Sequence, residues 1–272
     1  MKKHIGTIGK GVGFFILWLT SIAVIAVPAI GEPSFLHGNP ALLRLWWELL
    51  PMLGVFIATA IFILGIERNK IRIPILNNPV KNIAMGLVLG CIWLGAVMVF
   101  LFLIGVFAVA GKNDVSYLPI WFFAVLLNVI MQNYLVRGYL FELFREKYNT
   151  VTAVIITTIL FMAMHGGAFE AGAVAVINVV TMSVFVSLLL IYTKSLLAPI
   201  IAHFIWNSVG RLIFGVVSLA DDYPNLWNSS LTGNDLLSGG LFKIEGSVVV
   251  LVMNVMLIVF MAYLLRTRGR NE

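Results

Sequence analysis

Three short pieces of this sequence place polar side chains within long apolar runs. Their polar members are Gln132, Asn133, Arg137, His165, His203 and Asn207. Histidine is the side chain whose ordinary pKa allows proton transfer near neutral pH, and side-chain amides both donate and accept hydrogen bonds. Such a set has the chemistry of a general acid–base site that binds a polar substrate and activates water.

The spacing within two of these pieces is that of neighbours on a helix. Phe161 and His165 are four residues apart, as are His203 and Asn207, so each pair is expected to share one helix face. At 1.5 Å per residue, Gln132, His165 and His203 lie about 22, 21 and 14 Å from the nearest charged turn. We therefore expect the two histidines, Gln132 and Asn207 to line one polar cavity.

Other polar groups in the apolar runs have a structural interpretation. Asn128, Asn178 and Asn254 are expected to hydrogen-bond across helices, which stabilises membrane helix pairs by about 1 kcal/mol. Arg137 lies near the end of its run and has two interpretations. It is either a site residue or a side chain that extends to the membrane interface.

The elements that carry these residues are expected to be membrane helices. Hydrophobic residues make up 61% of the 272 residues and charged residues only 11%, whereas charged residues are about a quarter of a soluble chain. Eight apolar runs approach the roughly 20 residues that span a bilayer. These runs are 12–30, 47–66, 83–110, 117–141, 151–165, 171–192, 197–218 and 247–265. The predicted fold is all-α, a polytopic membrane helix bundle of about eight helices that forms one integral membrane domain over residues 1–272.

The distribution of lysine and arginine predicts the orientation. With the N-terminus inside, fourteen of the 18 basic residues fall in inner segments. The four outer ones are Arg44, Lys112, Arg211 and Lys243. Because cytoplasmic loops carry the excess of basic residues, both termini are predicted to be cytoplasmic, which requires an even number of spans. The same loops account for the net charge of +6, so no nucleic-acid partner is expected.

Taken together, the three pieces resemble the motifs of the CAAX protease and bacteriocin-processing (CPBP, or Abi) family of intramembrane proteases. Those motifs are Glu-Glu-x-x-x-Arg, Phe-x-x-x-His and His-x-x-x-Asn/Asp, in this order and on helices. The matching residues here are Arg137, Phe161 with His165, and His203 with Asn207. The resemblance covers about 115–215. It implies an intramembrane endopeptidase of a bacterial cell membrane that cleaves membrane-associated substrates such as prenylated proteins or peptide precursors.

The sequence departs from the family at the first motif, where Gln132 and Asn133 replace the two glutamates. The resemblance implies that the first glutamate activates water, that the two histidines assist, and that Asn207 stabilises the oxyanion. It also implies that the second glutamate pairs with Arg137. A glutamine has no titratable carboxylate and cannot accept a proton at neutral pH. Weak or no peptidase activity is therefore expected from this chain.

Two other acids are candidates to replace the missing carboxylate. Glu142 lies ten residues after Gln132 among other charges, which favours a solvated residue at the inner surface. Glu170, just beyond the second motif, is the better candidate. Arg137, without its glutamate, is expected to hold a backbone carbonyl or Glu142 instead, because a buried guanidinium needs acceptors.

Three functions remain open. The first is an endopeptidase with residual or altered chemistry, and the second is a catalytically inactive family member that binds or regulates a partner, as an immunity-type protein does. The third is a small-solute transporter, against which the absence of an inverted repeat argues. The expected partners are membrane lipid and a peptide or membrane-protein substrate. No cofactor is expected, because His165, His203 and an amide make a poor metal site.

Overall fold

The computed structural model describes residues 2–26, 33–218 and 222–271. The chain divides into two compact units, which are described separately below. The first comprises residues 1–74 and 117–157, and the second comprises residues 75–116 and 158–272. The last four residues of the first expected apolar run, 12–30, lie outside the described residues.

The first unit consists of helices. Its elements are α1 (Lys2–Ala26), a 3₁₀ turn η1 (Ser34–Leu36), α2 (Pro40–Ala60), a π-helical end η2 (Ile61–Ile66), α4 (Leu118–Arg137), α5 (Tyr139–Lys147) and the first half of α6 (Thr150–Ala163). Asn39 begins α2, since its side chain accepts a hydrogen bond from Leu42 N at 3.1 Å, and Pro40 occupies the first turn, where it needs no hydrogen-bond donor.

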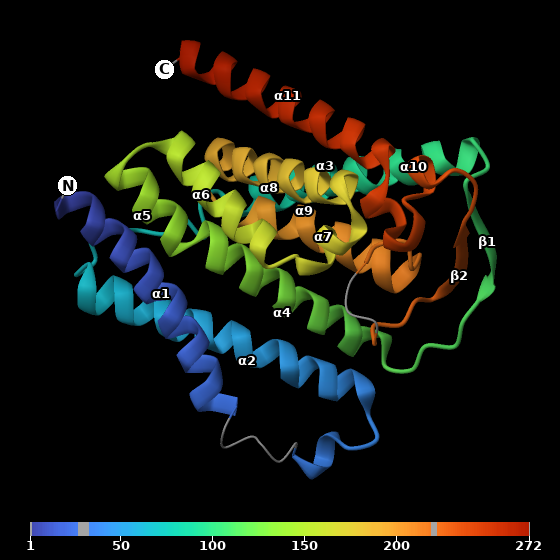
Figure 1. Cartoon of the computed structure of the whole chain (residues 1–272), viewed down its shortest axis with the longest axis horizontal. Helices are drawn as coiled ribbons and strands as arrows, with labels where there is room; N and C mark the ends of the chain where they lie inside the picture. The colour runs from blue at the N-terminus through green and yellow to red at the C-terminus, as the bar shows by residue number, and fades with distance from the viewer. Residues whose placement is uncertain (1, 27–32, 219–221, 272) are drawn as a thin grey trace. The chain divides into compact units, whose positions relative to one another are not determined.

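Close packing joins α1 to α2, which lie side by side in Figure 1. Gly54 on α2 makes this approach possible: a Cβ there would lie 2.9 Å from Ile22 Cγ1 and 3.3 Å from the Trp18 carbonyl oxygen. Small residues at such contacts are typical of membrane helix pairs. The Trp18 indole N–H also donates to the Pro51 carbonyl oxygen at 3.1 Å, which adds a hydrogen bond between α1 and α2.

A buried carboxylate joins three elements of this unit. Glu67, only 4% exposed, accepts from Lys10 Nζ at 2.6 Å and from the Tyr139 hydroxyl at 3.0 Å. Phe14 packs on the same tyrosine with ring centroids 4.9 Å apart. An acid buried in this way is stabilised only while its partners remain, so the contact fixes α1 and α5 against the end of η2.

The second unit carries most of the remaining helices and a small sheet. Its elements are α3 (Pro79–Leu103), β1 (Phe107–Lys112), the second half of α6, α7 (Gly166–Ala171), α8 (Ala173–Thr193), α9 (Leu197–Asn207), a π-helical end η3 (Ser208–Ile213), β2 (Trp227–Leu231), α10 (Asp235–Ser238), a 3₁₀ segment η4 (Gly240–Gly246) and α11 (Val248–Asn271).

Two glycines of α3 set the position of α9. A Cβ at Gly86 would lie 2.8 Å from the Ala198 carbonyl oxygen, and one at Gly90 would lie 3.0 Å from Ala202 Cα. The two helix backbones are therefore in direct contact, as small residues permit in membrane bundles. This contact matters for the site because α9 carries His203.

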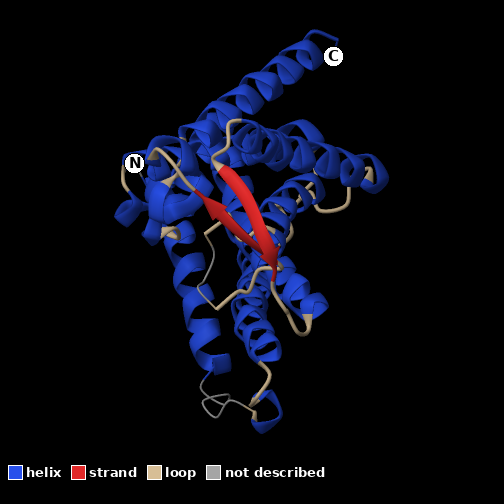
Figure 2. Cartoon of the chain, turned by 90° about the vertical axis from the view of Figure 1, so that its right-hand side faces the viewer, coloured by secondary structure: helices blue, strands red, loops and turns tan. Residues whose placement is uncertain are grey.

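The strands β1 and β2 form an antiparallel pair, drawn in red in Figure 2, with Phe107 opposite Leu231 and Lys112 opposite Trp227. This corrects the expectation of a single span over 83–110. Helix α3 ends at Leu103, and Gly105 turns the chain with a φ of +74°, a conformation that favours glycine. The apolar run continues beyond the turn because the first residues of the strand are themselves apolar.

Six described helical segments are long and apolar enough to cross a membrane: Gly6–Ala26, Pro40–Ile66, Pro79–Leu103, Leu118–Lys147, Ala173–Thr193 and Gly240–Gly269. Two shorter apolar helices are Thr150–Ala163 and Leu197–Ile213. These eight segments overlap the eight apolar runs of the sequence. The protein is an integral membrane protein, and its described residues form helices joined by loops and one pair of short strands.

Candidate functional site

In the second unit, the second motif ends a helix rather than lying along it. Helix α6 ends at Ala163, and His165 is in the turn before α7 with φ −109° and ψ 55°. The expectation that Phe161 and His165 share a helix face is therefore corrected. The next two residues, Gly166 and Gly167, begin the separate helix α7. The histidine still reaches back one turn, because its Nδ1 lies 2.7 Å from the Phe161 carbonyl oxygen.

This contact determines which nitrogen of the His165 ring carries the hydrogen. A carbonyl oxygen only accepts, so Nδ1 must carry the hydrogen and donate it. In the neutral ring, Nε2 is then the acceptor nitrogen. The backbone thus holds His165 in the tautomer that can take a proton from a water molecule through Nε2.

Phe161 lies between the two histidines. Its ring centroid is 4.3 Å from that of His165 and 6.0 Å from that of His203, the second pair at 65°. The Phe161 side chain is fully buried and His203 is 1% exposed. Aromatic rings at these separations attract one another in tilted and edge-on arrangements. The phenylalanine therefore sets the distance between the two imidazoles.

The third motif lies on one face of α9, as predicted. Asn207 Nδ2 lies 3.3 Å from His203 Nε2, and both side chains are buried. Since an amide nitrogen only donates, this Nε2 is the accepting nitrogen of His203. The structure thus brings Phe161, His165, His203 and Asn207 together in one cluster of the second unit, in which His165 is half-buried and the other three side chains are buried.

The first motif belongs to the first unit, where Gln132 is the end of a chain of polar side chains. Gln132 Nε2 donates to Asn128 Oδ1 at 2.7 Å, and Asn128 Nδ2 donates to Glu48 Oε2 at 2.9 Å. Arg44 Nη2 pairs with the other oxygen of Glu48 at 2.6 Å. Gln132 Oε1 is buried and accepts no hydrogen bond from any described residue. This chain links α2 to α4, and the predicted meeting of Gln132 with the histidines of the other unit stays a prediction.

Arg137 is fully buried, so it does not extend to the membrane interface. Its Nη1 donates to Asn133 Oδ1 at 3.2 Å, one turn earlier on α4. The amide at 133 thus gives the guanidinium an acceptor at the position of the family's second glutamate. Glu142 is buried rather than solvated and pairs with Arg145 at 2.5 Å, which corrects both expectations for that acid. Gly138 lets the chain break after Arg137, because a Cβ there would collide with the Tyr134 carbonyl oxygen.

Of the three asparagines expected to join helices, Asn128 and Asn254 do so, while the Asn178 side chain donates to the Glu245 and Ser247 carbonyls just before α11. Asn128 on α4 bonds to Glu48 on α2, as described above. Asn254 on α11 donates to the Asn178 carbonyl on α8 at 3.2 Å and accepts from Trp93 Nε1 on α3 at 2.8 Å. In the second unit this network holds α3, α8 and α11 together.

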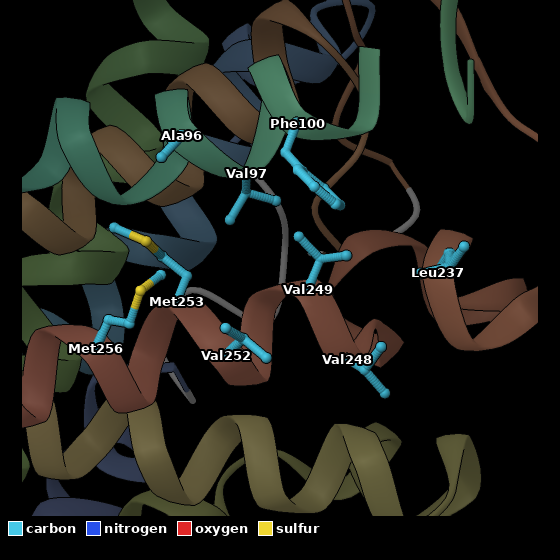
Figure 3. Close-up of a pocket in the computed structure, with 9 residues that line it drawn as sticks. All are labelled: Ala96, Val97, Phe100, Leu237, Val248, Val249, Val252, Met253 and Met256. Carbon is cyan, nitrogen blue, oxygen red and sulfur yellow. The ribbon is translucent and has the colours of Figure 1, made fainter. Parts of the chain in front are cut away.

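Two cavities of the second unit differ in chemistry. The larger, about 480 Å³, is lined by apolar side chains of α3 and α11 such as Val97, Phe100 and Met253, shown in Figure 3, and offers no group for acid–base chemistry. The other, about 340 Å³, is lined by His165, Ser218, Phe242 and Glu245, among others. This second cavity therefore holds the histidine of the second motif together with a carboxylate.

Sequence reasoning missed Glu245, which lies in a segment taken as an outer loop. Its Oε2 accepts from Ser218 N at 2.9 Å and its Oε1 accepts from Trp206 Nε1 at 3.4 Å. The sequence gives little indication of a role for Glu245. It is followed by Gly246 and then by an apolar run, a position that is typical of an ordinary loop residue. Glu170, the acid preferred from the sequence, is exposed on α7 and does not line this cavity.

No metal site is evident within the described ranges, where no group of three or more His, Cys, Asp or Glu side chains lies close enough to hold an ion. The expectation that no cofactor is needed stays a prediction. The donor set around the histidines is two imidazoles and an amide, and stable zinc sites have three or four good ligands.

The site defines a membrane protein with a histidine cluster that suits proton transfer. Comparison with protein families matches residues 114–209 to the family described as type II CAAX prenyl endopeptidase Rce1-like. This part of the chain is therefore a domain of the Rce1-like CAAX prenyl endopeptidase family. A search of curated proteins and a search of solved structures each gave no match.

The matched range is close to the expected core of about 115–215 and contains all three motif pieces. A protease family acts on peptide or protein substrates. Glu245 lies outside the matched range, 36 residues beyond its end at residue 209.

Proposed function

We propose that this protein is an intramembrane endopeptidase homologue that binds a peptide segment of a membrane-associated substrate and cleaves it weakly. The substrate is a prenylated protein end or a peptide precursor, the substrate classes of the family that it resembles. The observation that carries the proposal is the cluster in which Phe161 separates His165 and His203 and Asn207 hydrogen-bonds to His203.

The weakness follows from the first motif. In the family, the first glutamate is thought to activate the attacking water, and a positioned general base contributes about 10²–10⁴-fold to a rate. Gln132 accepts hydrogen bonds through one oxygen and cannot take up a proton. Cleavage by this chain is therefore expected to be slower by about that factor than cleavage by a relative with both glutamates.

A second function is favoured by the way the amides of the first motif are bonded. Gln132 uses its N–H₂ to donate to Asn128, and Asn133 uses both ends of its amide, donating to the Val129 carbonyl at 2.9 Å and accepting from Arg137. These contacts use the side chains as amides, which supports an inactive family member that binds a peptide or membrane-protein partner. Such an immunity-type or regulatory protein would keep the histidine cluster as a binding surface.

The proposed topology has eight spans with both termini in the cytoplasm. Its support is the agreement between the eight apolar runs and the six long and two short apolar helices, together with the excess of basic residues in the inner segments. The two short helices extend about 21 and 26 Å, less than the bilayer core of about 30 Å, so each needs neighbouring residues to complete its crossing.

The test uses the full-length protein in liposomes with two fluorogenic peptides, a farnesylated peptide with a Cys-aliphatic-aliphatic-X end and an unprenylated precursor peptide. The chain is compared with the double variant Gln132→Glu, Asn133→Glu. We expect slow cleavage by the chain and about 10²–10⁴-fold faster cleavage by the double variant. Peptide binding without cleavage by either protein would replace the enzyme proposal with the binding function, and no binding would contradict both.

A further inference from the structure

We propose that Glu245 is a catalytic base of this protein and acts with His165 on a water molecule in the cavity that they share. The proposal rests on the proposed function and adds a residue that lies outside the matched family range. It answers the question raised by the first motif, which has lost both carboxylates. A carboxylate that lines the cavity of His165 from another part of the chain can account for the slow cleavage that is expected to remain.

The shared cavity is the first observation. Of the acidic residues that the structure describes in the second unit, Glu245 is the one that lines the cavity of His165. The cavity volume is about 340 Å³, while a water molecule occupies about 30 Å³ in the liquid. The space is therefore large enough for an attacking water and for part of a peptide.

The second observation is that the Glu245 carboxylate is held in place. Each oxygen accepts one hydrogen bond, Oε2 from Ser218 N and Oε1 from Trp206 Nε1. A carboxylate oxygen has more than one acceptor position, so these bonds orient the group without using all its capacity. Orientation by neutral donors is the arrangement expected of a base that must still accept a proton.

The main chain at Glu245 is fixed as well. Asn178 Nδ2 on α8 donates to the Glu245 carbonyl at 2.8 Å and to the Ser247 carbonyl at 2.9 Å. Asn178 in turn accepts from Asn254 on α11 through its own carbonyl. Bonds of this kind between helices position η4 and so bring a residue from a short irregular segment to a defined place.

The third observation connects Glu245 to the helix of the third motif. Its partner Trp206 is the residue before Asn207 on α9, is 1% exposed, and stacks on Trp93 with ring centroids 4.3 Å apart. One rigid aromatic side chain therefore touches the carboxylate while its neighbour in sequence touches His203. A functional group supported by packed side chains keeps its geometry within the small tolerance that proton transfer requires.

The reaction is peptide hydrolysis, and the proposed step balances as follows. A water molecule donates one hydrogen bond to the Glu245 carboxylate and the other to His165 Nε2. Glu245 takes the first proton while the water oxygen forms a bond to the peptide carbonyl carbon. The tetrahedral intermediate then breaks its C–N bond, and the proton on Glu245 passes to the leaving amine nitrogen. One water is consumed, a carboxylic acid and an amine are formed, and no other reactant is required.

The test compares cleavage of the farnesylated peptide by the full-length chain and by Glu245→Gln in liposomes. Glutamine is nearly isosteric and keeps an acceptor for Ser218 N, so the variant removes the base at the cost of one long hydrogen bond, the 3.4 Å contact from Trp206 Nε1. We expect kcat to fall by about 10²–10⁴-fold with KM changed little, because a lost base affects the chemical step. Glu170→Gln is the matched control, since that acid is exposed on the neighbouring helix α7, and should leave kcat unchanged.

A purely structural role for Glu245 makes a different prediction, in which the Gln variant loses stability or affinity and keeps its kcat. Glu245→Asp serves as the second variant if Glu245→Gln does not fold. It keeps a carboxylate but withdraws it from the water, so kcat should fall by about tenfold or more while cleavage remains measurable. An unchanged kcat in either folded variant overturns the proposal.

The outcomes separate this inference from the proposed function. Cleavage by the chain that is lost in His165→Ala but kept in Glu245→Gln contradicts only the role of Glu245. Cleavage by the double variant Gln132→Glu, Asn133→Glu together with none by the chain contradicts both the role of Glu245 and the weak cleavage proposed for the chain, and favours the binding function. Absence of cleavage in all of these proteins contradicts the proposed peptidase function itself.

Discussion

The side-chain amide of Gln132 donates to Asn128 Oδ1 at 2.7 Å, one turn earlier on α4. Asn128 uses its own N–H₂ to donate to Glu48 on α2. The orientation of Asn128 is thereby decided at both ends, with its donor toward a carboxylate and its acceptor toward an amide. This arrangement requires a hydrogen-bond donor at position 132. Glutamine supplies one, whereas an ionised glutamate only accepts.

The first prediction follows from this match. Gln132→Glu places a carboxylate against Asn128 Oδ1, and a rotated Asn128 would turn that oxygen toward Glu48, so one hydrogen bond is lost in either orientation. We expect a loss of about 1–3 kcal/mol in the free energy of unfolding, seen as a lower thermal midpoint in detergent.

Adding Glu48→Gln should recover most of that loss, because the new amide at position 48 can donate to a rotated Asn128. Arg44, the partner of Glu48, would lose its ion pair in this variant, so Glu48→Gln alone serves as the reference. Equal losses from Gln132→Glu with and without the change at position 48 would contradict the matched arrangement.

The second prediction concerns the buried Arg137. Asn133→Leu removes the acceptor that lies 3.2 Å from Arg137 Nη1, and hydrogen bonds to charged groups contribute about 1.5–3 kcal/mol. We expect Asn133→Leu to lower the thermal midpoint and Asn133→Glu to maintain or raise it. A leucine variant as stable as the unchanged protein would show that Asn133 does not stabilise the guanidinium.

The third prediction separates the role of Phe161 in the site from its role in packing. Phe161→Leu removes the ring between the two imidazoles. Because a small displacement of a catalytic group lowers the rate strongly, the rate of peptide cleavage should fall at least about tenfold. Phe14→Leu is the matched control, because Phe14 is also fully buried and packs on aromatic rings, in the first unit. Both variants should lose similar stability, and only Phe161→Leu should lose activity. Equal activity in the two would contradict a positioning role for Phe161.

The fourth prediction is the topology. Reporter fusions after Lys81, Lys194 and Arg270 should report the cytoplasm, and fusions near Lys112 and Asn234 should report the outside, because the basic residues concentrate in the inner segments. An outside signal at Arg270 would contradict an even number of spans.

The long helices could be predicted from sequence because an apolar run of bilayer length has few other stable structures in a membrane. Their ends could not. The run that contains α3 remains apolar as far as Ala110, while the helix ends at Leu103 and the chain turns at Gly105. The apolar composition of α3 and β1 predicts that both segments are hydrophobic, but it does not indicate where the backbone changes from helix to strand.

The site was predictable where its contacts are local. The pair of His203 and Asn207 is one helical turn apart, so its spacing already implied the hydrogen bond that the structure shows. Glu245 depends instead on Ser218, Trp206 and Asn178, which are 27, 39 and 67 residues away. Tertiary hydrogen bonds at such separations leave no pattern in a single sequence, and the same holds for the carboxylate that they position.

The most direct test of the account is cleavage of the farnesylated peptide by the full-length chain, His165→Ala and His203→Ala in liposomes. The account predicts slow cleavage by the chain and a further loss of at least about 100-fold in each alanine variant, since each removes a group that handles a proton or positions one that does. The thermal midpoints of the variants check that they fold. Cleavage that continues at the original rate in both folded alanine variants would contradict the claim that the histidine cluster is the active site.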